Sequence, residues 1–439
     1  MAYDEERLLD KPLEQLLDAE WIESYQLGGF HPVDIGDTFH ADRYKVVRKL
    51  GHGGPRYVAM KIISSKASSA SKEIAINRSI RASNGARSHI VELLDNFNHV
   101  GPNGEHDCLV FEPMGPDVAA CFERSIPYRH CGPICKQLLT ALQCLHDLEV
   151  AHSDTNPGNL LLSLTHQIEN LFTGGRSVSA QIHGKRNPCA PEHIYEDRPL
   201  TEFCDTWLPQ NSSLLILVPA TFLFNNPPER PIIAVALRAP EVVLQSTFDY
   251  RIDIWSFACY LFEVFTGQPL FTLPEFDPAG VDDDHIHQMK FDDAPFSDGD
   301  HDHKLSGDDR LLQMNNDDHL LQMISTLGLP PSAIFEKWLR RTRYFDANLK
   351  IIRTDVGQSE TALGAIHVGN ALEQRFQDSR PQEMTTEECA DLVHVLRSAL
   401  QYDPTNRPST TELLRLDWFH RAYDVQRPGA RHKKMTPRC

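Results

Sequence analysis

The stretch His152-Ser153-Asp154-Thr155-Asn156-Pro157-Gly158-Asn159 decides how the rest of the chain is interpreted. Before it, apolar residues recur at spacings of three and four, which predicts a helix with one buried face; they are Ile134, Leu138, Leu142 and Leu145. Directly after it comes the apolar run Leu160-Leu161-Leu162. An acid, Asp154, and an amide, Asn159, are therefore placed together in a short polar segment between two apolar elements.

A second informative stretch is Val58-Ala59-Met60-Lys61. The segment 57–63 alternates in the manner of a strand, which puts Ala59 and Lys61 on one strand face. Glu73 follows twelve residues after Lys61, in the segment SKEIAINRSI. Taken alone, Lys61 is explained equally well as a functional lysine and as an ordinary exposed lysine of a strand. The other motifs are therefore needed to decide between the two interpretations.

Three further signals lie towards the C-terminus: Ala239-Pro240-Glu241, then Asp253-Ile254-Trp255-Ser256, then Arg407 within DPTNRPS. The segment 252–266 is apolar all round, which is typical of a buried helix, and Gly267 is its expected C-cap. Two later helices are predicted to start with capping boxes, at Thr385 to Glu388 and at Ser409 to Glu412.

In this order and spacing, from Tyr44 to Trp418, the motifs resemble those of protein kinases. The resemblance implies an α+β fold with two lobes, a small β-rich N-lobe and a larger helical C-lobe. It divides the chain into an N-terminal extension at 1–43, an N-lobe at 44–113, a C-lobe at 114–420 with irregular insertions at about 163–212 and 276–316, and a basic tail at 421–439.

The resemblance also gives the catalytic-loop residues their roles. Asp154 corresponds to the acid that accepts the proton of the substrate hydroxyl, and Asn159 to the amide that holds a magnesium ion. Asn156 occupies the catalytic position where the family usually has a lysine that steadies the transferring phosphoryl group. The implied cofactors are ATP and Mg²⁺.

The same resemblance assigns the nucleotide-binding residues. Lys61 is expected to bind the α- and β-phosphates of ATP with Glu73 as its ionic partner, and Gly51 and Gly53 belong to the Gly-rich loop over the phosphates. Farther on, the resemblance implies a buried ion pair between Glu241 and Arg407.

Within the kinases, three segments are similar to the SR-protein kinases. They are the lead-in at 29–37 with 44–51, the catalytic loop with Ser153 at the usual arginine, and DDHLLQMISTLGLPP at 317–331. The similarity implies basic Arg/Ser-rich protein substrates such as splicing factors. The net charge of −18 suits a basic partner and argues against direct binding of nucleic acid.

Two catalytic parts depart from the kinase pattern. Gly53-Gly54-Pro55-Arg56 passes directly into Tyr57, so the second strand of the Gly-rich hairpin is missing. The acid of the D-F-G triplet is also missing, because the register puts Leu217-Val218-Pro219 there; Asp205 is the nearest substitute. Two hypotheses follow: an active serine/threonine kinase, or a pseudokinase or degenerate kinase that binds peptides with weak or no phosphotransfer.

One heptapeptide occurs three times, at 283–289, 308–314 and 317–323. Only the third copy continues into an apolar helical pattern, so we expect the first two in an acidic loop. Their Asp and His residues offer loose metal ligands, although acidic runs are usually only solvated.

The ten cysteines form no C-x-x-C pair, which predicts reduced thiols. Cys131 and Cys135 beside His130 suggest a metal site, but helical cysteines usually pack as small apolar groups. We see no secretory signal and no membrane span, and we expect a monomer shared between cytoplasm and nucleus. The basic C-terminal tail is the feature that suggests a nuclear location.

Overall fold

The computed structural model of the chain describes residues 22–47, 57–68, 72–82, 89–119, 126–164, 177–179, 181–182, 185–195, 214–218, 222–224, 228, 233–273, 307–351 and 371–424. Its internal contacts divide the chain into two compact units. The first unit comprises Met1–Ser125 and Pro157–Thr221, and the second comprises Ile126–Asn156 and Phe222–Cys439. The first is built mainly on strands and the second on helices, so the predicted α+β fold is confirmed.

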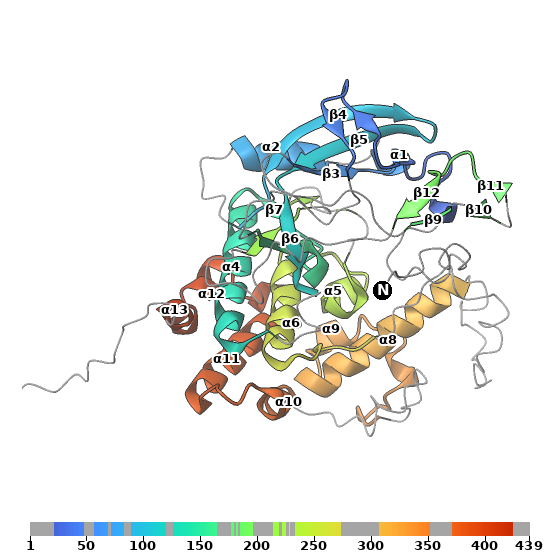
Figure 1. The fold of residues 1–439 in the computed structure, drawn as a ribbon. Coiled ribbons are helices and arrows are strands. Elements are labelled where there is room, and N and C mark those ends of the chain that lie inside the picture. The colour runs from blue at the N-terminus through green and yellow to red at the C-terminus, as the bar shows by residue number, and fades with distance from the viewer. Residues whose placement is uncertain are drawn as a thin grey trace, which may run out of the picture. The chain divides into compact units, whose positions relative to one another are not determined.

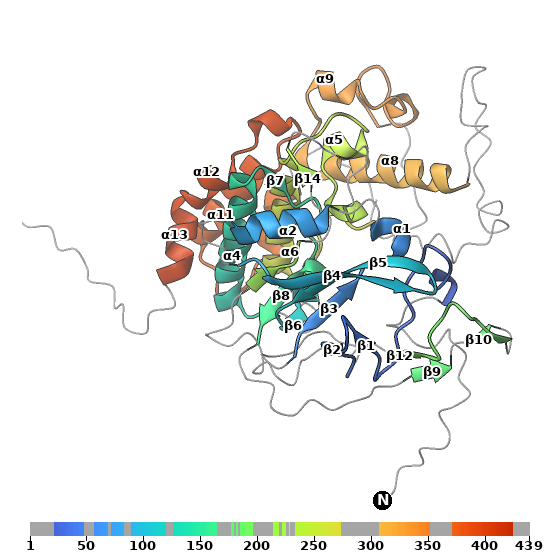
Figure 2. The same cartoon turned by 90° about the horizontal axis from the view of Figure 1, so that it is seen from above.

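The first unit contains a three-stranded antiparallel sheet in the order β3-β5-β4 (Figure 1). Its strands are β3 (Ala59–Ile62), β4 (Leu93–Gly101) and β5 (Gly104–Phe111), and helix α2 (Glu73–Ala82) lies beside β4 (Figure 2). The sequence around 91–94 and 108–112 predicts short strands at these places, and the structure has strands there that are longer. Polar residues such as Asn96 and Asn98 have low strand propensity, but the continuous pairing of β4 with β5 overrides it.

The N-terminal segment is folded against this hairpin. Strands β1 (Thr38–Phe39) and β2 (Tyr44–Lys45) pair with each other, and the His31 ring contacts the rings of His99 and His106 at centroid distances of 4.6 and 5.1 Å. A side chain at Gly101 would meet the His31 ring, since an added Cβ would lie 2.2 Å from His31 Nδ1. The absence of a side chain at Gly101 therefore permits the close approach of His31.

A second sheet of the first unit has the order β13-β8-β6, from β6 (Met114–Asp117), β8 (Leu160–Ser163) and β13 (Leu214–Ile216). By its contacts the first unit therefore extends past the expected lobe boundary at 113 and includes 157–221. The predicted insertion at 163–212 contains short strands, so it is not irregular throughout; they are β9 (Ser177–Ser179), β10 (Gln181–Ile182), β11 (Lys185–Arg186) and β12 (His193–Tyr195).

The second unit is organised around the buried helix α6 (Ile252–Thr266) (Figure 1). Helices α4 (Tyr128–Asp147) and α11 (Thr386–Ala399) pack against α6, and α12 (Thr410–Leu414) packs against α4. The predicted apolar face of α4 is buried. Gly267 caps α6 with a φ of 67°, and both predicted capping boxes are present. These sequence signals therefore identified the ends of the helices correctly.

The remaining helices and strands are short except for α8. Those of the first unit are η3 (Ile22–Ser24), α1 (Ser65–Ser68) and η4 (Pro157–Asn159). Those of the second unit are β7 (Val150–Ala151), β14 (Phe222–Leu223), η6 (Val235–Leu237), α5 (Pro240–Val243), α8 (Gly307–Leu327), α9 (Ser332–Phe335), η8 (Arg341–Arg343), α10 (Ala371–Ser379), η9 (Pro404–Asn406) and α13 (Asp417–Asp424).

Helix α8 corrects one expectation about the repeat. The second copy, 308–314, lies inside this helix rather than in a loop, so the predicted insertion at 276–316 ends earlier, before Gly307. The third copy buries Leu320, Leu321 and Met323, and adding residues to an existing helix costs less than starting one. The polar second copy therefore continues the helix. The first copy, at 283–289, lies outside the described residues.

None of the helices in the described ranges combines the length and the apolar character needed to cross a membrane. Cys131 and Cys135 are buried free thiols of α4, and burial raises the pKa of both. They pack in the interior as the sequence predicted for helical cysteines.

Candidate active site

Lys61 and Glu73 form the predicted ion pair. Lys61 lies on β3, and its Nζ is 2.9 Å from both carboxylate oxygens of Glu73 at the start of α2. The Glu73 side chain is only 5% exposed, whereas that of Lys61 is 37% exposed. Burial raises the pKa of Glu73, and the charge of Lys61 opposes that shift. The pair thus presents a fixed ammonium group that solvent and a phosphate can reach.

Strand β13 carries the chain to the position beside Asn159. It pairs antiparallel with β8, so that Ile216 faces Leu160, and the next residue, Leu217, donates its N–H to Asn159 O at 2.9 Å. Val218 follows and is 2% exposed. The first two of the three residues expected in place of the D-F-G triplet, Leu217 and Val218, thus follow directly on the strand pair. Because the Leu217 N–H is already bonded to Asn159, we assign the place of the acid to Val218, one residue later than the sequence register gave.

Helix α2 ties these residues to the Lys61–Glu73 pair. Asn77, one turn after Glu73, donates its Nδ2 to Glu73 O at 2.9 Å and to Val218 O at 3.5 Å. Ala59, Ile74 and Leu217 pack against one apolar cluster, whose buried members are Ile63, Val91, Leu93, Leu109, Phe111, Met114 and Leu161. These three residues lie within two positions of Lys61, Glu73 and Val218 in the sequence. The same apolar cluster therefore holds the backbone near all three.

The catalytic loop of the second unit is held by Asp253 from α6. The two Asp253 carboxylate oxygens accept the backbone N–H groups of His152 and Ser153, each at 2.8 Å. His146 Nε2 lies 2.9 Å from Oδ2 of the same carboxylate, which is 1% exposed. A buried carboxylate needs such partners, because an unpaired one is costly to bury.

Ser153 adopts the left-handed conformation with a φ of 58°. A residue other than glycine held in this region costs about 1–3 kcal/mol, and such residues concentrate at functional sites. The hydrogen bond from its N–H to Asp253 helps to offset that cost. The strained turn is what directs the chain from the strand β7 into Asp154.

The Asp154 carboxylate has an amide neighbour. Asn156 donates its Nδ2 to Asp154 Oδ1 at 2.7 Å, and Asp154 N–H donates to His152 Nδ1 at 3.2 Å. The bond to Oδ1 orients the carboxylate. In this structure Asn156 thus interacts with the candidate base itself, a contact that the sequence did not predict.

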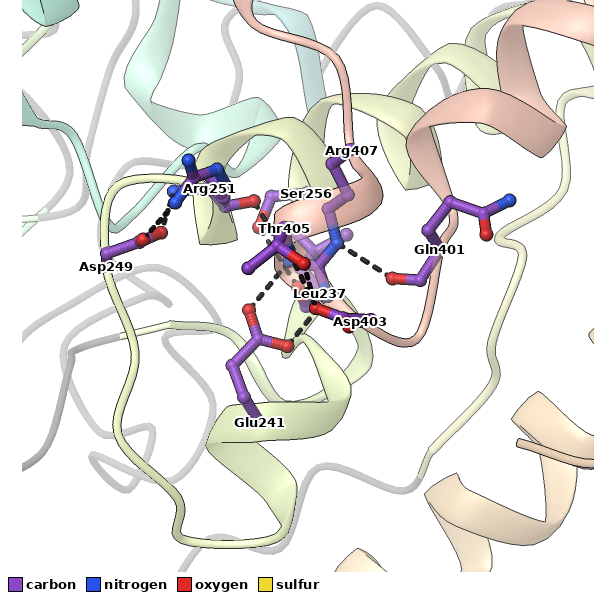
Figure 3. A network of polar contacts seen from close by, with 9 residues as sticks. All are labelled: Leu237, Glu241, Asp249, Arg251, Ser256, Gln401, Asp403, Thr405 and Arg407. Atoms are coloured by element: carbon purple, nitrogen blue, oxygen red, sulfur yellow. Dashed lines mark hydrogen bonds and ion pairs between the residues drawn. The ribbon is translucent and has the colours of Figure 1, made fainter. Parts of the chain in front are cut away.

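Glu241 and Arg407 form the predicted buried pair (Figure 3). The two guanidinium nitrogens lie 2.6 and 2.7 Å from the two carboxylate oxygens, and the side chains are 0% and 5% exposed for Arg407 and Glu241. Arg407 also donates to the carbonyl oxygens of Gln401 and Arg251. The pair joins α5 to the loop before α12 and the start of α6.

Sequence reasoning placed Asp253 on the buried helix but not at the catalytic loop. The signal was present in the D-I-W-S motif, because an acid in the first turn of an otherwise apolar helix needs a partner. Three predicted or alternative site residues, Gly51, Gly53 and Asp205, lie outside the described residues. Asp154 and Asn156 belong to the second unit, and Lys61, Glu73 and Asn159 to the first.

A family model for the protein kinase domain matches residues 43–209 and 220–419. The chain belongs to the protein kinase family. The match is interrupted at 210–219, which includes β13 and Val218, so the kinase pattern is lost where the metal-binding acid is expected.

Relatives place the kinase among those similar to the SR-protein kinases, which confirms the resemblance drawn from the sequence. Serine/threonine-protein kinase SRPK of Physarum polycephalum is 29% identical over 307 residues, 62% of this chain and 71% of that protein. Protein kinase dsk1 of Schizosaccharomyces pombe is 37% identical over 168 residues, 33% of this chain and 31% of that protein. A serine/threonine protein kinase of Aspergillus fumigatus is 25% identical over 423 residues, 92% and 91% of the two chains.

A protein kinase domain implies ATP and a divalent metal. Lys61, whose side chain is part-exposed and whose ammonium is held by Glu73, suits the phosphates of ATP. The metal fits less well. Divalent cations of this kind bind oxygen ligands, above all carboxylates, but the residue beside Asn159 that ought to supply one is the buried, apolar Val218.

Proposed function

We propose that this kinase transfers the γ-phosphate of ATP to serine in basic Arg/Ser-rich proteins. Lys61 holds the phosphates, and Asp154 orients the serine hydroxyl and accepts its proton. The observation that carries the proposal is the Lys61–Glu73 pair, which is formed within an intact core. The net charge of −18 supports a basic substrate.

Of the two expected cofactors, ATP has a prepared partner in Lys61, and Mg²⁺ has Asn159 as its predicted ligand. Loss of the carboxylate at Val218 removes a group that holds charge-neutralising metal near the phosphates. We therefore expect transfer slower by orders of magnitude than in kinases that have the acid.

The test is transfer of labelled phosphate from ATP to an Arg-Ser repeat peptide, with an Arg-Ala repeat as the peptide control. Asp154→Asn removes the base with little change of shape, and Lys61→Ala removes the phosphate ligand. Transfer to the Arg-Ser peptide that both substitutions abolish is the expected result. Equal transfer by wild type and Asp154→Asn would mean that a contaminating kinase is measured.

A second candidate function is a peptide-binding pseudokinase, which Val218 favours. It predicts that the Arg-Ser peptide binds with the same affinity to wild type and Asp154→Asn while neither transfers phosphate. Binding without transfer supports this second candidate over the first.

A further inference from the structure

The β8–β13 pair fixes what lies beside Asn159, and this determines how a nucleotide can be held. The pairing of β8 with β13 fixes the register of the two strands, and Leu217 donates its N–H to Asn159 O. Val218 is therefore fixed as the residue that follows this bond. Asn77 also binds the carbonyl of Val218 from α2. The position is part of the packed interior and not of a flexible loop.

The segment at this position supplies no carboxylate for a metal ion. The sequence from Leu214 to Thr221 is Leu-Leu-Ile-Leu-Val-Pro-Ala-Thr, without Asp or Glu. Mg²⁺ requires nearly octahedral oxygen coordination, and proteins usually supply one or two carboxylates beside the phosphates. Here the amide oxygen of Asn159 is the predicted side-chain ligand, and a neutral amide binds a divalent cation less strongly than a carboxylate does.

The positive charge predicted for the phosphates, and present among the described residues, is that of Lys61. Its ammonium is held by two hydrogen bonds to a carboxylate that is 5% exposed, so its position does not depend on a bound metal. We propose that this chain binds nucleoside triphosphate through Lys61 without requiring a divalent cation. The inference rests on the proposed nucleotide binding, but it does not depend on phosphotransfer.

The experiment measures binding of ATP to the full chain by calorimetry and by thermal unfolding, once with EDTA and once with excess Mg²⁺. We expect dissociation constants that agree within about twofold, a difference of only ~0.4 kcal/mol. Lys61→Ala should abolish binding under both conditions. Val218→Asp should restore metal dependence, with weaker binding in EDTA because its charge repels the phosphates, and tighter binding with Mg²⁺.

Val218→Ala is the matched control, because it reduces the side chain without adding a ligand and should remain independent of metal. If Val218→Asp does not fold, the wild-type comparison and Val218→Ala decide the question. Binding by wild type that appears only with Mg²⁺ would overturn the inference and leave the proposed kinase function standing. No binding of ATP under either condition would overturn both.

Discussion

The hydrogen bond from Asn156 to Asp154 changes the role of a residue that is usually a lysine. A lysine at this position adds charge near the phosphate, whereas this amide donates to the carboxylate Oδ1 at 2.7 Å. This bond holds the Asp154 carboxylate in a defined orientation. Asn156 therefore acts as a positioning residue in the proposed reaction.

Replacing Asn156 tests this role. Asn156→Ala should lower kcat by about tenfold or more, since a hydrogen bond to a charged group contributes ~1.5 kcal/mol or more. Asn156→Asp should lower it further, because a second carboxylate repels Asp154, and KM for ATP should change little in both. Steady-state kinetics on the Arg-Ser peptide measure these constants. Equal kcat in wild type and both variants would contradict the positioning role.

At the scale of elements, the buried pair of Glu241 and Arg407 connects three segments of the second unit. Removing one partner of a buried pair leaves an uncompensated charge in the interior, which costs about 3–5 kcal/mol. Glu241→Gln should therefore lower the free energy of unfolding by about 3 kcal/mol, measured by urea denaturation.

The matched control is Glu92→Gln. Glu92 is half-exposed and lies 3.8 Å from Arg81, and an exposed ion pair contributes about 0–1 kcal/mol. The same loss of stability in both variants would show that the buried pair is no more important than a surface one.

We expect the contact of the N-terminal segment with the β4–β5 hairpin to depend on pH through His31. Burial, together with the nearby His99 and His106, lowers the pKa of His31 from 6.5 to about 4. Between these pH values the unfolded chain binds a proton at this position that the folded chain does not. The contribution of His31 to stability is therefore complete above pH 6.5 and decreases as the pH falls towards 4.

We expect the melting temperature of the wild type to fall more between pH 7 and pH 5 than that of His31→Phe, which keeps an aromatic ring against Phe39 and cannot be protonated. Thermal unfolding at the two pH values measures the difference. A decrease of the same size in both proteins would mean that His31 is not the group that titrates.

For the molecule as a whole, the sequence predicted the elements whose signals are local. The capping boxes of α11 and α12 and the apolar face of α4 follow from short local patterns, whereas the ion pairs of Lys61 and Arg407 were predicted from the resemblance to protein kinases. The length of β4 and β5 depends on the pairing of the two strands with each other, and the start of α8 depends on extension of a helix whose third repeat copy is buried. The Asn156–Asp154 bond depends on a rotamer, which no motif specifies.

The net charge of −18 also has a consequence at this scale. Attraction of a basic peptide acts over distances comparable to the Debye length, which is about 10 Å at 0.1 M salt and 3 Å at 1 M. Binding of an Arg-Ser peptide should weaken several-fold between low and high salt, measured by fluorescence anisotropy. A Gln-Ser peptide of the same length is the control and should show little change. Affinity for the Arg-Ser peptide that does not vary with salt would contradict the electrostatic part of the proposal.

The connection from β8 to β13, residues 164–213, is attached to the first unit part-way along. Asn103 donates to Cys189 O at 2.7 Å, Asn187 donates to Tyr25 O, and Asp34 accepts the N–H groups of Glu192 and His193. These bonds divide the long connection into two shorter loops. Doubling the number of residues in such a loop raises the entropic cost of closing it by only about 0.6 kcal/mol. Changes of length on either side of the attachment should therefore have little effect on the pairing of β8 with β13.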